Sequence, residues 1–292
     1  MYFRYDEPLF RPPAEAYSAI IQATLGCSWN RCAFCDMYSS KKFRPRTFDE
    51  LKPEIETLAA MYQGVKKVFL ADGNAFVLSA NRLLQLLEEI NRCFGRVQRV
   101  SSYALPRDIL SKTDDELKSL RANGLKLLYI GVETGDDELL RLIGKGETAD
   151  STVEGILKAH SAGIETSIMI INGLGGKRYS QQHAVNSAKV ISRVNPKFLS
   201  TLTLSMPLGE DHFKEKFRGE FIPLTVVELF EELRTFISLS EVDGTIYRSN
   251  HVSNNLNLSG TLSKDKEQLL AQLDRAIALT PRGIYPSSPS ML

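Results

Sequence analysis

Three of the four cysteines of this chain, Cys27, Cys32 and Cys35, fall within a span of nine positions. Thiols clustered in this way are typical of metal ligation or redox chemistry rather than of a disulfide framework. Soft thiolate ligands suit iron–sulfur clusters, and three of them can hold three irons of a [4Fe–4S] cubane. The fourth iron then has no obvious protein ligand, which leaves one of its coordination positions open. An open iron is useful to an enzyme that must bind a substrate there, so the spacing favours catalysis over electron transfer.

Zinc is the alternative metal for these thiols. A structural zinc site needs a fourth ligand, usually Cys or His. The remaining residues of these types are Cys93, His160, His183, His212 and His251. Cys93 falls in register with the apolar positions of a predicted helix, and we interpret it as a buried structural thiol. The iron–sulfur cluster is therefore the favoured assignment.

The elements that must position these residues alternate between strand and helix patterns from about residue 18 to residue 205. The predicted strands cover 18–25, 67–71, 98–104, 126–132, 165–171 and 198–205. Helix starts with capping-box spacing are Thr47–Glu50, Thr113–Glu116, Ser151–Glu154 and Thr225–Glu228, and helices should stop at Gly124 and Gly163. Repeated β-then-α units predict a parallel sheet, either open and doubly wound or a full or partial barrel.

Six such units are too few for a complete eight-stranded barrel. The predicted fold is therefore α/β, a partial (β/α)6 TIM-like barrel of parallel strands with a C-terminal α-rich extension. We divide the chain into an N-terminal segment (1–17), a core (18–205) and a C-terminal extension (206–292). Within the extension we expect a strand at 244–248, a last helix at 264–278 and a loose Pro/Ser-rich tail at 286–292.

Functional side chains in parallel α/β folds gather where strands end. The cysteine segment follows the first predicted strand, and Asp72-Gly73-Asn74 follows the second. Glu133 directly follows the fourth predicted strand. A charge beside an apolar strand needs a polar partner, and a surface charge at the strand end is the alternative. Glycines after the fifth strand (Gly173, Gly175 and Gly176) permit close backbone approach.

The segment 248–255 follows the strand expected in the extension and concentrates Arg, His, Ser and three Asn. We interpret it as lining the substrate side of an active site, with His251 as a proton donor or orienting group. A solvated Asx-type turn is the alternative, because Ser and Asn favour such turns.

The charge of the chain is nearly balanced, with 36 Lys and Arg against 35 Asp and Glu. It gives no electrostatic reason to expect nucleic acid or an anionic membrane as a partner. The N-terminus carries both signs of charge and no apolar signal-peptide region, and no apolar run approaches the ~20 residues that cross a bilayer. We expect a cytoplasmic protein that acts on a small molecule.

Cys27, Cys32 and Cys35, with Phe34 directly before the last cysteine, resemble the cluster loop of the radical S-adenosylmethionine (SAM) superfamily. The sequence from about residue 18 to residue 205 is similar to the branch that contains oxygen-independent coproporphyrinogen oxidase and the methylthiotransferases. One departure is that four residues separate Cys27 from Cys32, where three are usual.

The resemblance implies the cofactors and the site. A [4Fe–4S] cluster would be held by the three cysteines, and SAM would bind beside it. Reduced flavodoxin or ferredoxin would supply the electron. Residues implied at SAM are Phe34, Asp72, Gly73, Asn74, Ser102, Glu133, Gly173, Gly175 and Met206. Arg141 and Arg178 are candidates for the SAM carboxylate, with an exposed helix position as the alternative for each.

The implied reaction is reductive cleavage of SAM to methionine and a 5′-deoxyadenosyl radical, which abstracts hydrogen from an unidentified substrate. With only Cys93 left over, we expect no auxiliary cubane cluster, and we expect no cobalamin domain beside the core. Two other functions stay open: a non-catalytic zinc or Fe–S protein, and an RNA-modifying radical SAM enzyme.

Overall fold

The computed structural model describes residues 4–95 and 97–285, so the tail 286–292 lies outside the described residues. The chain forms two compact units. Unit 1 comprises Met1–Asn30, Cys35–Ile130 and Glu154–Thr166, and unit 2 comprises Arg31–Phe34, Gly131–Val153 and Ser167–Leu292. Along the chain, strands β6 (Leu125–Glu133) and β7 (Glu165–Asn172) begin in unit 1 and end in unit 2.

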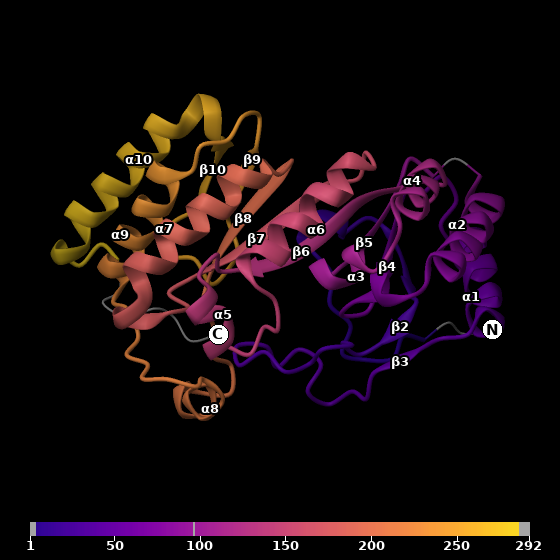
Figure 1. Ribbon diagram of the computed structural model, residues 1–292, viewed down its shortest axis with the longest axis horizontal. Helices are drawn as coiled ribbons and strands as arrows, with labels where there is room; N and C mark the ends of the chain where they lie inside the picture. Colours follow the sequence, from indigo (N-terminus) through magenta and orange to yellow (C-terminus); the bar gives the residue numbers. More distant parts are fainter. Residues whose placement is uncertain (1–3, 96, 286–292) are drawn as a thin grey trace. The chain divides into compact units, whose positions relative to one another are not determined.

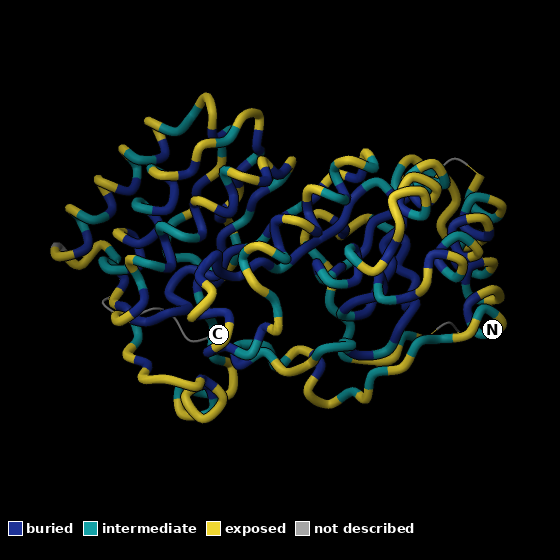
Figure 2. The backbone as a smooth tube through the Cα atoms, viewed as in Figure 1, coloured by how far each residue is buried: buried dark blue, intermediate teal, exposed yellow. Residues whose placement is uncertain are grey.

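Unit 1 contains a parallel sheet in the order β1 (Ala19–Gln22), β4 (Lys67–Ala71), β5 (Arg99–Tyr103) and β6. Its helices are α1 (Phe48–Met61), α2 (Ala80–Phe94), α3 (Pro106–Leu110), α4 (Asp114–Ala122) and most of α6 (Ala149–Ser161), with short 3-10 turns η1 (Pro13–Glu15) and η2 (Ala75–Val77). Figure 1 shows the helices α1, α2 and α4 outside strands β4 and β5. These strands are buried almost throughout (Figure 2).

Unit 2 contains parallel strands β7, β8 (Phe198–Thr203) and β9 (Ile246–Ser249), and β10 (Leu258–Thr261) pairs antiparallel with β9. Its helices are α5 (Asp137–Leu142), α7 (Gly176–Val194), α8 (Glu210–Lys216), α9 (Val226–Leu239) and α10 (Leu262–Leu279), followed by η3 (Thr280–Arg282). Helix α9 packs against both α7 and α10 (Figure 1).

These elements confirm the predicted α/β class, a partial (β/α)6 barrel of parallel strands followed by an α-rich C-terminal region. The strand expected at 244–248 is β9. Strand β10 was not predicted, because its sequence Leu-Ser-Gly-Thr buries only Leu258 and so shows no alternation. The domain boundaries at 17/18 and 205/206 stay predictions.

Three of the four expected helix starts are confirmed as capping boxes, at Thr47, Thr113 and Thr225. The fourth, at Ser151, is wrong. Helix α6 begins at Ala149, and Thr148 exchanges hydrogen bonds with Ser151: the Ser151 N–H donates to Thr148 Oγ1 (3.0 Å) and the Thr148 N–H donates to Ser151 Oγ (2.9 Å). Thr148 therefore caps the helix, since Ser can replace Glu as the reciprocal acceptor.

The first predicted strand, 18–25, is two elements. After β1 the chain leaves the sheet, and the separate β2 (Thr24–Leu25) pairs antiparallel with β3 (Arg44–Pro45). This pairing brings together the two ends of the segment that carries the cysteines.

Within the described residues, none of the helices combines the length and the apolar character that crossing a bilayer requires.

Candidate active site

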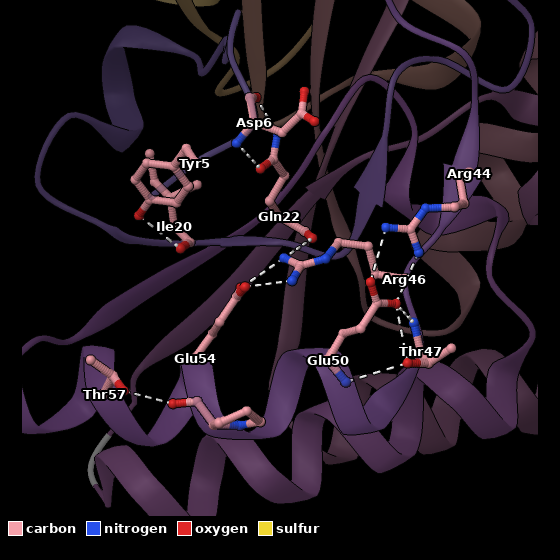
Figure 3. A network of polar contacts seen from close by, with 11 residues as sticks. Tyr5, Asp6, Ile20, Gln22, Arg44, Arg46, Thr47, Glu50, Glu54 and Thr57 are labelled. Atoms are coloured by element: carbon pink, nitrogen blue, oxygen red, sulfur yellow. Dashed lines mark hydrogen bonds and ion pairs between the residues drawn. The ribbon is translucent and has the colours of Figure 1, made fainter. Parts of the chain in front are cut away.

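The cysteine loop, residues 26–43, is closed at its base by the β2–β3 pair. Arg44 of β3 makes two hydrogen bonds of 2.9 Å to Glu50 of α1, and Arg46 bonds Glu54 of the same helix at 2.7 Å (Figure 3). The Arg44–Glu50 pair is exposed, and such a pair contributes at most about 1 kcal/mol. The effect of the two pairs is geometric, because they fix the returning end of the loop to a helix.

The starting end of the loop is fixed from β1. Gln22 exchanges hydrogen bonds with the backbone of Asp6: its Oε1 accepts from the Asp6 N–H (3.0 Å) and its Nε2 donates to the Asp6 carbonyl (2.8 Å). The backbone carbonyl of Gln22 accepts from Arg46 (Figure 3). The N-terminal segment therefore lies along β1 beside the base of the loop.

Asp72, in the turn after β4, holds the base of the loop with a fully buried carboxylate. Its Oδ2 accepts from the Gly26 N–H (3.1 Å), from Lys41 Nζ (2.9 Å) and from Gln22 Nε2 (3.3 Å). Three donors, one of them cationic, compensate for burying the charge. Oδ2 of Asp72 thus serves the structure, whereas its buried Oδ1 has no hydrogen-bond partner among the described residues.

Gly73 brings this turn against the cysteines. A Cβ at this position would lie 2.8 Å from Cys27 Cβ and 2.7 Å from Tyr38 Cε2, closer than real Cβ atoms approach. Only glycine therefore allows the turn after β4 to pack on the loop. This contact joins a predicted metal ligand to a predicted SAM-binding turn within unit 1.

Asn74 is buried, and its Nδ2 donates to Ser28 Oγ of the loop (2.9 Å) and to Asp108 Oδ2 of α3 (2.5 Å). Among the described residues, its Oδ1 has no hydrogen-bond partner, and the same holds for the buried hydroxyl of Tyr38. Unsatisfied buried polar atoms are rare in native proteins. Burial and the nearby Asp72 carboxylate raise the pKa of Tyr38, so its phenol stays neutral and can donate.

Helix α3 and the residues that follow it contact η2, the 3-10 turn directly after Asn74. Lys112 is buried, donates to the backbone carbonyl of Phe76 (2.9 Å) and lies 4.3 Å from the centre of that ring. Burial lowers the pKa of Lys112 to about 8. The guanidinium of Arg107, which is on α3, lies 4.2 Å from the ring centre of Trp29 in the cysteine loop.

Ser102 on β5 is fully buried, and its hydroxyl donates to the Tyr103 carbonyl (2.9 Å). Tyr103 packs edge-on against Phe69 of β4, with ring centres 5.1 Å apart. Burial, together with the nearby Asp72 and Cys35, raises the pKa of Tyr103. Sequence reasoning missed Tyr103, which stands beside Ser102 and close to a cysteine.

In unit 2, Glu133 is buried, which excludes the alternative of a surface charge. Its Oε1 accepts from Lys145 Nζ at 3.0 Å, and Lys145 also lies 5.8 Å from the ring centre of Phe34. A Cβ at Gly131 would lie 1.9 Å from Glu133 Oε1, so glycine is required for the carboxylate to fold back over the strand. Glu133 was predicted to need a polar partner, and that partner is Lys145.

The loop segment 31–34, which includes Cys32, is bound to the end of α5. The Ala33 N–H donates to the Ile143 carbonyl (2.8 Å), and a Cβ at Gly144 would lie 3.1 Å from the Arg31 carbonyl. Phe34 and Met206, both predicted at the SAM site, are partly buried and pack with Leu204 against one apolar cluster. Its members are Ala33, Leu139, Leu142, Ile143, Ile171, Leu174, Tyr179, Phe213, Phe217 and Phe221.

The glycine turn after β7 is shaped by its neighbours. Gly173 has a φ of +82°, and a Cβ there would lie 2.7 Å from Leu229 Cδ2. A Cβ at Gly175 would lie 2.7 Å from Tyr179 Cβ. Packing alone therefore requires both glycines, and their contact with adenine stays a prediction.

A buried His–Glu pair behind this turn was missed. Glu232 of α9 accepts from the Gly173 N–H (2.5 Å), and its Oε1 lies 3.8 Å from Nε2 of His183 on α7. His183 Nδ1 lies 2.8 Å from Thr134 Oγ1, directly after Glu133. Burial lowers the pKa of His183 to about 4 and raises the pKa of Glu232 to about 7. Both residues occupy amphipathic helices, where no local pattern distinguishes them.

The loop of His251 follows β9, which joins the sheet in parallel with β8. His251 Nδ1 contacts Ser253 Oγ at 2.8 Å and accepts from the Ser253 N–H at 3.2 Å. Asn254 fixes the loop to β8, since its Oδ1 accepts from the Thr203 N–H (2.7 Å) and its Nδ2 donates to the Thr201 carbonyl (2.9 Å). A catalytic role for His251 stays a prediction.

The two arginines considered for the SAM carboxylate are exposed, Arg141 on α5 and Arg178 on α7. Arg178 pairs at 3.7 Å with Glu220, which is also exposed. Cys93 was expected to be buried but is only partly buried. Its Sγ lies 3.6 Å from Glu89 Oε1. That carboxylate is bonded by Arg92, so the thiol lies at a salt-bridged helix surface rather than in the core.

The residues present fit an iron–sulfur cluster and SAM. The side chains of Cys27, Cys32 and Cys35 are all partly buried. The packing of Gly73 on Cys27 and the orphaned Oδ1 of Asn74 provide a polar, closely packed surface beside the first thiol.

A family model described as the Radical SAM superfamily matches residues 21–188, more than half of the chain. The chain therefore belongs to the Radical SAM superfamily. This confirms the predicted class, a radical SAM enzyme.

Curated relatives include the heme chaperone HemW of Bacillus subtilis, 28% identical over 165 residues, which cover 54% of this chain and 43% of that protein. The tRNA-2-methylthio-N(6)-dimethylallyladenosine synthase of Chlorobium phaeobacteroides is 28% identical over 177 residues, covering 58% of this chain and 39% of that protein. The chain thus spans less than half the length of these relatives.

Two solved structures show the same fold. Coproporphyrinogen III oxidase (HemN) from Escherichia coli has a TM-score of 0.60 and 20% identity, covering 76% of this chain and 52% of that one. Methylornithine synthase (PylB) has a TM-score of 0.53 and 18% identity, covering 94% of this chain and 82% of that one.

Proposed function

We propose that this chain uses Cys27, Cys32 and Cys35 to hold a [4Fe–4S] cluster and cleaves SAM reductively to act on a small-molecule substrate. The observation that carries the proposal is the contact between the Gly73 turn and Cys27, within a chain that belongs to the Radical SAM superfamily. When bound, the reduced cluster would supply the electron that splits SAM into methionine and a 5′-deoxyadenosyl radical, which abstracts hydrogen from the substrate.

The protein would contribute binding and geometry. The backbone of the turn Asp72-Gly73-Asn74 would receive the methionyl ammonium, and Glu133 would accept a hydrogen bond from SAM. Gly173 and Gly175 would lie against adenine, with Ser102 on the rim. The apolar side chains of Phe34 and Met206 would exclude water.

The proposed electron donor is reduced flavodoxin or ferredoxin, and the proposed location is the cytoplasm. The Asn254 bonds to β8 hold the His251 loop at the end of β9, where His251 would donate a proton to the substrate or orient it.

A tRNA substrate is the second candidate, favoured by the similarity to the tRNA-2-methylthio-N(6)-dimethylallyladenosine synthase. The net charge of +1 provides little attraction for RNA. Retention on a total-tRNA column at about 0.15 M salt, with cleavage of SAM stimulated by tRNA, would support this candidate over a small molecule.

The deciding experiment is anaerobic reconstitution followed by reduction with dithionite and addition of SAM. We expect about four irons and four sulfides per chain, and slow release of 5′-deoxyadenosine and methionine without substrate. A protein that instead retained one zinc, or a fully reduced cluster that bound SAM and released no deoxyadenosine, would support the non-catalytic alternative.

A further inference from the structure

The sheet of unit 2 has one buried face and one face that is partly exposed. Side chains along β7, β8 and β9 alternate between these faces, as the pleat of a sheet requires. On the buried face, the hydroxyls of Tyr247 and Thr201 lie 2.7 Å apart, and Ser249 is buried beside them. Asn172 Nδ2 donates to the Leu229 carbonyl of α9 from the same face (3.0 Å). Helix α9 therefore covers this face.

Arg248 belongs to the opposite face. It lies between the buried residues Tyr247 and Ser249 of β9, and it is exposed. The register of the sheet pairs Arg248 with Ser200 of β8 on one side and with Ser259 of β10 on the other. Paired residues on neighbouring strands share a face, and their Cβ atoms are about 5 Å apart. Two hydroxyls therefore flank the guanidinium.

The guanidinium of Arg248 has donors to spare. Its Nη1 donates to the Tyr247 carbonyl at 3.4 Å, which is long for a hydrogen bond. Among the residues that the structure describes, no carboxylate forms an ion pair with it, whereas Arg44, Arg46 and Arg234 each have one. A guanidinium carries five N–H donors in a planar fork that matches a carboxylate. Arg248 is therefore able to bind an anionic ligand.

Apolar side chains surround Arg248 on the same face. Met169 of β7 is paired with Ser200, in the row that contains Arg248. Phe198 and Ile246 are paired in the row before it, and Leu202 lies in the row after it. All four apolar side chains are only partly buried. A ligand bound to the guanidinium would therefore also contact apolar surface.

This face continues to the residues proposed at SAM. Ile171 shares the face with Met169 and is two residues, or about 7 Å, nearer the end of β7. Ile171 belongs to the apolar cluster against which Phe34 and Met206 pack. All these residues lie in unit 2, as Arg248 does. The guanidinium is thus one row of side chains farther from the strand end than Ile171.

We propose that Arg248, flanked by Ser200 and Ser259, binds a carboxylate of the substrate, and that the substrate is a carboxylic acid with an apolar portion. The inference rests on the proposed function and names its substrate class. The guanidinium would donate two parallel hydrogen bonds to the carboxylate, and each serine hydroxyl could donate one more. The apolar portion would lie against Met169 and Phe198.

The test is ligand binding by the reconstituted holoenzyme, measured by anaerobic isothermal titration calorimetry. The probe is 4-phenylbutyrate, which joins a carboxylate to an apolar chain and ring. The wild type should bind it about tenfold or more tightly than 4-phenylbutyramide, which has a similar shape without the charge.

Three variants locate the site. Arg248→Gln should lose the preference for the acid over the amide, because it removes the cation. Ser200→Ala should weaken binding of the acid several-fold, by the loss of one hydrogen bond. Arg275→Gln is the matched control, since it removes an exposed arginine of α10 in the same unit, and it should keep the wild-type preference.

Failure of the wild type to bind the acid, equal binding of acid and amide, or an unchanged preference in Arg248→Gln would overturn the inference. Tighter binding of 4-phenylbutyl phosphate than of the acid would replace the carboxylic acid by a phosphate ester. Release of deoxyadenosine by the wild type without substrate is measured on the same samples. A wild type that bound the acid through Arg248 but released no deoxyadenosine would contradict the proposed function and leave the carboxylate site standing.

Discussion

The carboxylate of Glu232 on α9 accepts a hydrogen bond of 2.5 Å from the backbone N–H of Gly173 in the turn after β7. Glu232 lies in the C-terminal region of the chain, and Gly173 lies in the part that resembles the radical SAM core. The C-terminal region therefore contributes a buried carboxylate that fixes a turn predicted to contact adenine.

This arrangement predicts a pH-dependent stability. Burial raises the pKa of Glu232 to about 7, so the folded protein binds more protons than the unfolded chain between about pH 4.5 and 7. Its contribution to the free energy of unfolding therefore falls as pH rises through this window, by about 1.4 kcal/mol per pH unit at most. Glu232→Gln lacks this titration.

Relative to the protein that keeps Glu232, Glu232→Gln should gain stability from about pH 5 to 7 and show a constant difference above. Anaerobic urea unfolding of both proteins at four pH values measures this. His183 lies 3.8 Å from Glu232 and titrates in the opposite direction, so both proteins carry His183→Gln, which removes its contribution. A pH-independent difference between the two proteins would contradict the assignment.

A second prediction concerns the metal ligands. Cys32→Ala should abolish cluster assembly, because two thiolates do not hold a cubane that needs three. Cys93→Ala should retain the full iron and sulfide content, since that thiol lies beside Glu89 on α2. Iron and sulfide analysis with the visible spectrum measures both, and full iron in Cys32→Ala would show that the ligand assignment is wrong.

A third prediction concerns the Gly73 contact. Gly73→Ala should reduce cluster occupancy several-fold, because the added methyl would displace Cys27 and Tyr38. Gly64→Ala is the control: it has a φ of +79° and open space around its Cα, so it adds backbone strain of about 1 kcal/mol without a steric contact. Equal iron content in both variants would mean that the turn does not support the cysteine loop.

A fourth prediction concerns His251. His251→Ala should leave cluster content and basal SAM cleavage intact while uncoupling SAM cleavage from product formation. Deoxyadenosine and product are quantified together, once deoxyadenosine trapping has identified a substrate. Normal turnover in this variant would favour the alternative of a solvated turn, in which Ser253 bonds His251 locally.

The sequence was sufficient to predict the parallel strands and most helix starts, because alternation, apolar runs and capping boxes are local signals. It could not predict the partners of buried charges. Lys145 stands twelve positions after Glu133, and Glu232 stands 59 positions after Gly173, so only the fold brings these pairs together. Strands β2 and β3 have two residues each, which is too short for any periodic pattern.

The β2–β3 pair also allows the four-residue separation of Cys27 and Cys32. It makes the cysteine loop a closed insert whose ends are fixed to each other rather than to the pitch of a helix. For such a loop, one additional residue costs less than about 0.1 kcal/mol in closure entropy. Loops of different length could therefore be exchanged at this junction without shifting the register of the sheet. Residues 26–43 are thus a suitable segment in which to introduce the cysteine spacing of other family members.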